Sequence, residues 1–171
     1  AVGFPSGAVS TVAKLLDVKE QMALGCREFD MVIDIGALKS GLFNVVEKDI
    51  RSVVEAADGY PVKTIIEVSM LTDDDIKKAS ELAVKSGATF VKTGTGWAGK
   101  PTTAEHIRLI KSVVGNDAYI KAAGGVRTMK DIVSLIGEGC SRFGIGMNSI
   151  LNIMKELGDS TVECADVKVL Y

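Results

Sequence analysis

Two lysines lie in neighbouring apolar stretches, Lys92 within residues 90–96 (F-V-K-T-G-T-G) and Lys121 within residues 120–125 (I-K-A-A-G-G). A single such lysine is explained by a solvated strand end, where the amine reaches water. Two on adjacent strands, ~4.8 Å apart, disfavour each other's charge, and partial desolvation adds to that effect. A lysine with a free amine attacks a carbonyl and forms a Schiff base. The pair therefore predicts carbon–carbon bond chemistry that needs no metal and no other cofactor.

Carboxylates accompany the lysines. Asp30 lies in the apolar stretch E-F-D-M-V (residues 28–32), where an unpaired acid would be costly. Two explanations stay open: an ion pair with a lysine, or a proton relay with Lys121 toward a substrate hydroxyl. Asp34 and Glu67 are weaker candidates, expected as ion-pair members at the same edge. His106, the only histidine, lies in a helical pattern and is expected at the surface.

Two glycine-rich segments, residues 123–128 and 144–149, run from a predicted strand into a predicted helix. Backbone amides without a Cβ in the way, at a helix N-terminus, form an anion site. Arg127 could add a charged fork. Glycines are also needed simply to close such loops, but two of these loops beside the lysines favour a phosphorylated substrate.

Short apolar runs alternate with amphipathic stretches along the whole chain, as in strand–helix units of a parallel sheet. We expect strands at residues 1–4, 29–35, 62–68, 89–92, 119–122 and 142–145. Helices are expected at residues 10–24 and 44–57, from Asp73 to Gly87, from Pro101 to Gly115, and after Thr128.

Strands that are apolar on both faces leave two architectures, an open doubly wound sheet or a (β/α)8 barrel. Periodicity does not choose between them. Polar residues follow nearly every predicted strand, and in a barrel all strand ends converge on one mouth, whereas an open sheet concentrates them at one switch point. The residues favour the barrel.

Composition narrows the class of protein. The chain has 171 residues, 47% hydrophobic and 25% charged, with a net charge of −2. The charge argues against nucleic-acid binding, and no apolar stretch approaches the ~20 residues of a membrane helix. Cys26, Cys140 and Cys164 form no C-x-x-C pair, so we expect ordinary thiols in a reducing cytoplasm.

These motifs resemble the deoxyribose-phosphate aldolases, class I aldolases with a (β/α)8 barrel. The resemblance covers about the first 155 residues and is strongest in K-T-x-T-G from Lys92 and K-x-A-G-G-V-R-T from Lys121. It implies reversible cleavage of 2-deoxyribose 5-phosphate to acetaldehyde and glyceraldehyde 3-phosphate. It also implies small phosphorylated substrates and a homodimer or larger homo-oligomer.

By matching position, Lys92 would form the Schiff base, Lys121 would favour its uncharged amine, and Asp30 would transfer protons with Lys121. The resemblance places the following residues around the substrate and its phosphate: Thr95, Gly96, Gly124, Gly125, Arg127, Gly144 and Gly146. Four positions depart from the family pattern. Gly146 and Met147 stand where serines or small hydroxyl residues are usual, and Trp97 where some members carry lysine. Asp34 also replaces a frequent asparagine.

Length bears on how much of a barrel is present. Eight strand–helix units need about 200 to 250 residues, and six strands are expected here. We therefore expect a partial barrel at residues 1–157, lacking the first two units, and a tail of unknown role at residues 158–171. The alternatives are a related lysine aldolase with altered acceptor specificity, motivated by Trp97, Gly146 and Met147, and a catalytically silent barrel fragment.

Overall fold

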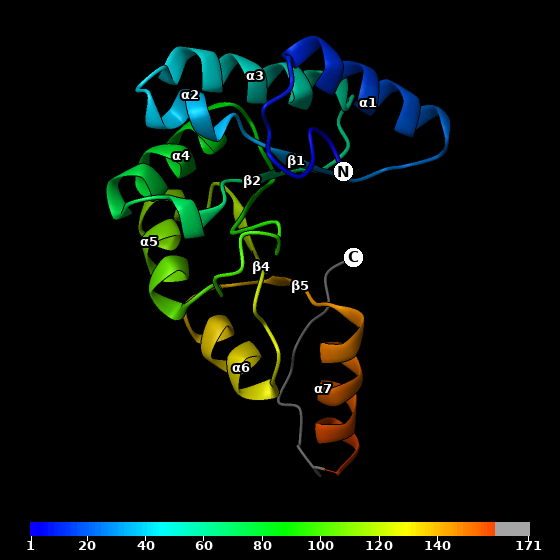
Figure 1. Cartoon of the computed structure of the whole chain (residues 1–171), viewed down its shortest axis with the longest axis vertical. Coiled ribbons are helices and arrows are strands. Elements are labelled where there is room, and N and C mark those ends of the chain that lie inside the picture. The colour runs from blue at the N-terminus through cyan, green and yellow to red at the C-terminus, as the bar shows by residue number, and fades with distance from the viewer. Residues whose placement is uncertain (160–171) are drawn as a thin grey trace.

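The computed structural model describes residues 1–159, in which short strands alternate with helices (Figure 1). The strands are β1 (Phe29–Val32), β2 (Val62–Ile65), β3 (Phe90–Lys92), β4 (Tyr119–Ala123) and β5 (Arg142–Gly144). The helices are α1 (Thr11–Ala23), α2 (Ile35–Lys39), α3 (Phe43–Ala56), α4 (Asp73–Lys85), α5 (Ala104–Val114), α6 (Met129–Gly137) and α7 (Met147–Asp159), with a 3-10 turn η1 (Val68–Met70).

All five strands pair in parallel and follow the order of the chain, β1-β2-β3-β4-β5. The helices form an arc around the sheet (Figure 1). The sheet curves enough that Arg142 of β5 reaches Glu28, next to β1, with 2.7 Å between Nη1 and Oε2. Sequential parallel order, outer helices and a curved sheet are the features of a (β/α)8 barrel, so the described strands form part of one.

The expected strand at residues 1–4 is wrong as a full strand. Val2 alone makes a parallel bridge, to Met31. Gly3 then takes a φ of +63°, a left-handed conformation that an extended strand cannot continue through. The strands expected at residues 29–35 and 62–68 also end early. Asp34 caps α2, and Glu67 has a φ of +57°.

Threonines set the beginnings of three helices through capping boxes, in which the cap side chain and a later side chain satisfy each other's backbone amides. Thr128 caps α6 as expected. Thr72, rather than Asp73, caps α4, and Thr103 caps α5, which begins later than the expected Pro101. The start of α5 is delayed because Thr102 is bonded to the residue that follows β4: its amide donates to the Gly124 carbonyl at 2.9 Å.

His106 is half-buried and completes the cap of α5, where its Nδ1 accepts from the Thr103 amide at 3.1 Å. The expected boundary between residues 157 and 158 falls within α7. The rest of the expected tail, residues 160–171 with Cys164, lies outside the described residues. Within residues 1–159, no helix combines the length and apolar character needed to span a bilayer.

Candidate active site

The sheet register brings the two lysines side by side. Lys92 of β3 and Lys121 of β4 are direct partners in the ladder, while Asp30 of β1 is the partner of Lys63 on β2. Lys63 in turn pairs with Phe90, two residues before Lys92. Because side chains alternate between the two faces of a strand, all four charged residues lie on one face of the sheet.

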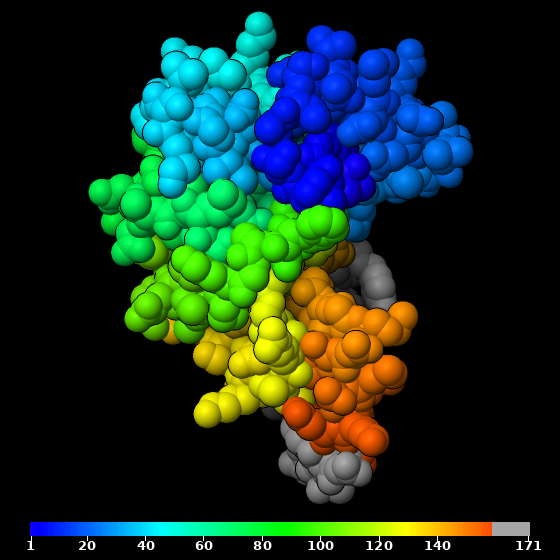
Figure 2. All heavy atoms as spheres, viewed as in Figure 1, coloured from blue at the N-terminus to red at the C-terminus, as the bar shows by residue number. Residues whose placement is uncertain are grey.

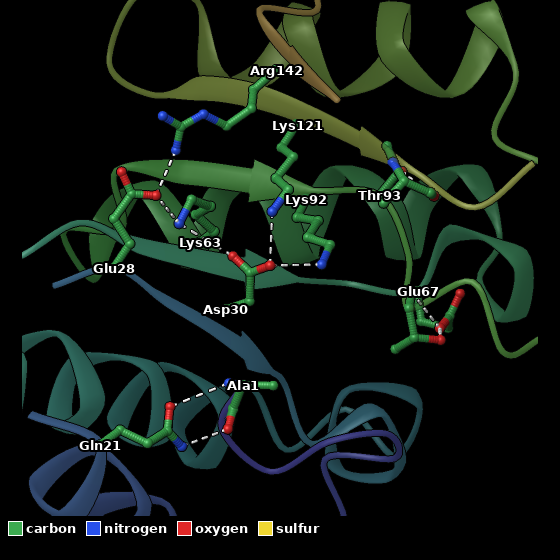
Figure 3. Close-up of polar contacts among 12 residues, drawn as sticks. Ala1, Gln21, Glu28, Asp30, Lys63, Glu67, Lys92, Thr93, Lys121 and Arg142 are labelled. Atoms are coloured by element: carbon green, nitrogen blue, oxygen red, sulfur yellow. Dashed lines mark hydrogen bonds and ion pairs between the residues drawn. The ribbon is translucent and has the colours of Figure 1, made fainter. Parts of the chain in front are cut away.

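Asp30 joins the two lysines. Its Oδ2 atom accepts hydrogen bonds from the Nζ atoms of Lys92 and Lys121, each at 2.8 Å (Figure 3). The ion pair expected for Asp30 is therefore present, and it is made with two lysines at one oxygen. Both ammonium groups are close neighbours because they share that atom.

The electrostatics of this cluster have opposing causes. Burial alone would raise the pKa of Asp30, but hydrogen bonds from Lys121 and Lys92 outweigh it and hold that pKa well below its usual range. Burial lowers the pKa of Lys121, and the positive charges of Lys92 and Lys63 add to this, while Asp30 opposes it. The cluster therefore holds a firmly ionised carboxylate beside a lysine that loses its proton more easily than in water.

Three further charged residues extend the cluster, and sequence reasoning missed them. Lys63 Nζ lies 2.7 Å from Glu28 Oε2 and 3.3 Å from Asp30 Oδ1, and Glu28 also pairs with Arg142 (Figure 3). A signal was present in the sequence. Lys63 interrupts an apolar run just as Lys92 and Lys121 do, and Glu28 is two residues from Asp30 on the same face.

A cavity of about 460 Å³ opens beside Lys92 at the carboxyl ends of β3, β4 and β5. All seven residues expected around the substrate line it. The lining is Lys92, Thr95, Gly96, Trp97, Ala123, Gly124, Gly125, Val126, Arg127, Gly144, Ile145, Gly146 and Ser149. Asp30 and Lys121 are not among these residues, but Asp30 is hydrogen-bonded to the lining residue Lys92. Ser149, in the first turn of α7, is a lining residue that sequence reasoning missed.

Glu67 organises the loop that follows β3. Its carboxylate accepts from the Thr95 amide at 3.0 Å, from the Thr95 hydroxyl, and from the Ser69 hydroxyl at 3.1 Å. The ion pair expected for Glu67 is thus replaced by hydrogen bonds that fix the loop. Asp34 likewise serves as a helix cap, accepting from the Ala37 amide at 2.8 Å.

Glycine is required where β4 meets the loop before α5. Gly125 has a φ of +80°, and a Cβ built there would lie 2.6 Å from the Cα of Pro101. Thr93 and Thr102 hold the same junction, since both hydroxyls donate to the Ala123 carbonyl, at 3.0 and 2.9 Å. The close approach leaves backbone, rather than side chains, facing the cavity at Gly124 and Gly125.

Trp97 forms the outer wall of the cavity and is 74% exposed. Its ring meets that of Phe4 edge to face, with centroids 5.8 Å apart. In Figure 2 the green surface of the loop after β3 lies against the dark blue N-terminal residues. A segment far away in the sequence therefore contacts a residue that lines the cavity.

A parallel α/β barrel segment with paired lysines at the carboxyl edge of its strands defines the class of protein. Comparison with known proteins identifies one family within that class. The sequence profile described as DeoC/LacD family aldolase matches residues 4–156. The chain belongs to this family.

Individual relatives agree. "Deoxyribose-phosphate aldolase 1" of Staphylococcus aureus is 47% identical over 156 residues, which are 91% of this chain and 70% of that protein. A putative deoxyribose-phosphate aldolase structure from Coccidioides immitis superposes with a TM-score of 0.87 at 34% identity, covering 92% of this chain and 62% of that one. A tetrameric deoxyribose phosphate aldolase from Aeropyrum pernix gives 0.81 at 25% identity, covering 92% and 66%.

Proposed function

We propose that this protein is a class I aldolase that reversibly cleaves 2-deoxy-D-ribose 5-phosphate to acetaldehyde and D-glyceraldehyde 3-phosphate. The observation that carries the proposal is the Asp30 carboxylate held between Lys92 and Lys121, with Lys92 at the wall of a glycine-lined cavity. Membership of the aldolase family and the deoxyribose-phosphate aldolase relatives support the substrate.

Lys92 is the proposed nucleophile because it is the lysine that reaches the cavity. Its uncharged amine adds to the C1 carbonyl of the open-chain sugar, and loss of water leaves an iminium ion. Removal of the C3 hydroxyl proton then breaks the C2–C3 bond. The bonding electrons move into the iminium to give an enamine, and glyceraldehyde 3-phosphate leaves. Protonation of the enamine carbon and hydrolysis release acetaldehyde and restore the amine.

Asp30 and Lys121 are proposed to manage the protons of these steps. Lys121 shares the Asp30 oxygen with Lys92, so a proton can pass within the cluster without crossing bulk water. The lowered pKa of Lys121 suits a group that both gives and takes a proton. The lowered pKa of Asp30 keeps it ionised between proton transfers, so that it holds both amines in place.

The phosphate is proposed to bind at the part of the cavity that is lined by glycine backbone. There the backbone of Gly124, Gly125 and Gly146 lines the wall together with the exposed Arg127 side chain. Amides unobstructed by side chains and a guanidinium are suitable ligands for a phosphate dianion. Gly96 and Gly144 also line the cavity.

A second candidate function is a related lysine aldolase that prefers a different acceptor aldehyde. The observation that favours it is Trp97, which adds a large apolar surface to the cavity wall and contacts Phe4. Met147 follows the cavity residue Gly146 and is itself exposed. Both candidate functions share the Schiff-base step. They differ in the acceptor aldehyde, which is the part of the substrate that does not bond to the lysine.

Borohydride trapping with acetaldehyde, followed by mass mapping, tests the shared chemistry. A label on Lys92 is expected under either aldolase function, and a folded protein without a label would instead indicate a catalytically silent barrel. Turnover of deoxyribose 5-phosphate against deoxyribose separates the two aldolases. A strong preference for the phosphorylated sugar is expected, and equal rates would refute the phosphate site.

We also propose a cytoplasmic location and assembly with further copies of the chain. Cys26 and Cys140 are free thiols, as is usual in a reducing compartment. The Aeropyrum pernix relative is tetrameric. Light scattering of the purified protein measures the assembly directly, and a single-copy mass would contradict that part of the proposal.

A further inference from the structure

The proposed mechanism uses one oxygen of Asp30 and leaves the other to be explained. Oδ2 receives both reactive-site lysines, whereas Oδ1 is buried and has no hydrogen bond among residues 1–159. The charge that faces Oδ1 is Lys63, whose Nζ lies 3.3 Å away. The Lys63 side chain is only 4% exposed.

Lys63 is held from its other side by Glu28, at 2.7 Å. The hydrogen bond from Lys63 is the largest cause of the lowered pKa of Glu28, and the hydrogen bond from Arg142 also contributes. A buried lysine is costly unless paired, and Lys63 is paired twice. Positive and negative groups therefore alternate from Arg142 through Glu28 and Lys63 to Asp30.

We propose that Lys63 is a positioning residue for the aldolase reaction: by holding Oδ1 of Asp30, it aims Oδ2 at Lys92 and Lys121. The terminal torsion of an aspartate is broad and nearly two-fold. Without the positive charge of Lys63 facing Oδ1, the carboxylate can rotate and offer either oxygen to either lysine. Lys63 is not among the residues that line the cavity and acts through Asp30. The inference rests on the proposed function.

Lys63 also acts on Lys121 at longer range. The groups whose charges bear on Lys121 are Asp30, Lys92 and Lys63, with Arg142 at the paired position on β5. Removing the Lys63 charge removes one of the repulsions that lower the pKa of Lys121. The pH dependence of the reaction should therefore move together with its rate.

The test is Lys63→Met, which keeps an unbranched side chain one atom shorter and removes its charge. We expect kcat to fall by about 10-fold or more, but by less than the 10²–10⁴-fold attributed to general acid–base catalysis itself. We expect KM to change little, because Lys63 is not at the cavity. The basic limb of the kcat profile should shift to higher pH, a change that a purely structural role would not produce.

The double variant Glu28→Gln/Lys63→Met separates positioning from stability. The double variant leaves no Glu28 charge without Lys63, so most of the unfolding free energy lost in Lys63→Met should be recovered. Urea unfolding measures this free energy. The kinetic defect and the pH shift should persist because Asp30 Oδ1 is still unheld. If the single variant fails to fold, the double variant decides the question alone.

Arg142→Gln is the matched control, since it trims the same chain of charges but leaves both contacts of Lys63. Its kcat should stay within about 3-fold of wild type, as expected for a partly exposed ion pair. A wild-type rate and pH profile in the folded Lys63 variants would overturn the inference. Failure of the proposed function is distinguishable, because wild-type protein would then show no acetaldehyde trapping on Lys92.

Discussion

At the scale of single residues, the site depends on unequal surroundings for two similar lysines. Lys92 lines the cavity, whereas Lys121 does not, and burial lowers the pKa of Lys121. One lysine can thus contact the substrate while the other manages protons. Sequence alone identified both lysines and Asp30 because each interrupts an apolar run. It missed Lys63, because the contact with Asp30 depends on the register between β1 and β2. That register pairs two residues that lie 33 positions apart in the sequence.

Replacing the proposed nucleophile tests this division of roles. Lys92→Arg keeps a positive charge near Asp30, so we expect the fold to be retained. A guanidinium is always protonated in proteins, so cleavage of deoxyribose 5-phosphate should fall on the order of 10³-fold or more, the scale seen when a covalent nucleophile is removed. Steady-state kinetics and circular dichroism provide the measurement. Activity near wild type would assign the nucleophile to Lys121.

The lowered pKa of Asp30 predicts how stability depends on pH. A carboxyl group with a lowered folded-state pKa stabilises the fold above its unfolded value, 3.8, and this contribution is lost as pH falls toward the folded value. Asp30→Asn should therefore lower the free energy of unfolding by about 3 kcal/mol at pH 7, as for breaking a buried ion pair. The difference from wild type should shrink below about pH 4.

Urea unfolding at several pH values measures this difference. Asp74→Asn on α4 is the control, because the Asp74 side chain is 96% exposed. It should change stability by less than about 0.5 kcal/mol at every pH. A difference between wild type and Asp30→Asn that stays constant from pH 7 to pH 3 would contradict the prediction.

At the scale of elements, the junction of β4 with the loop before α5 positions the site. Sequence patterns predicted α1, α3 and α6 closely, because their boundaries depend on local caps and periodicity. They placed the start of α5 too early, since Thr102 is held by hydrogen bonds to β4 rather than by any neighbour in the chain. They also extended the first strand through Gly3, where the backbone turns.

Gly125→Ala tests that junction. The left-handed φ and the contact with Pro101 both oppose a methyl group, so we expect a loss of about 1–3 kcal/mol in unfolding free energy. Turnover should fall as well, because the displaced loop forms the cavity wall. Gly137→Ala in α6 is the matched control: a Cβ there meets nothing within 4 Å, and a helical glycine should gain up to about 1 kcal/mol. Equal effects at both glycines would rule out the steric explanation.

At the scale of the whole molecule, the site draws on both ends of the described chain. Glu28 beside β1 pairs with Arg142 of β5, and Phe4 contacts Trp97, which lines the cavity. The chain covers about 70% of the length of its Staphylococcus aureus relative, and the strands that carry the lysines are all within it. The barrel class could be inferred from the sequence because each unit repeats the same pattern. The contacts across the barrel could not, since they depend on how strongly the sheet curves.

The contact between Phe4 and the cavity residue Trp97 predicts a change in acceptor preference. Trp97→Ala removes a large apolar wall and the support of Phe4 while leaving the lysine cluster in place. In the synthetic direction, with acetaldehyde as donor, we expect kcat/KM for an apolar acceptor such as propanal to fall about 10-fold, within the range for lost apolar pocket contacts. Glyceraldehyde 3-phosphate, proposed to be held at its phosphate by Arg127 and glycine amides, should lose much less. Phe4→Leu should give an intermediate loss for propanal, because Trp97 remains but its edge contact does not. Equal losses for both acceptors would show instead that Trp97 stabilises the loop after β3. They would count against a role for Trp97 in acceptor preference.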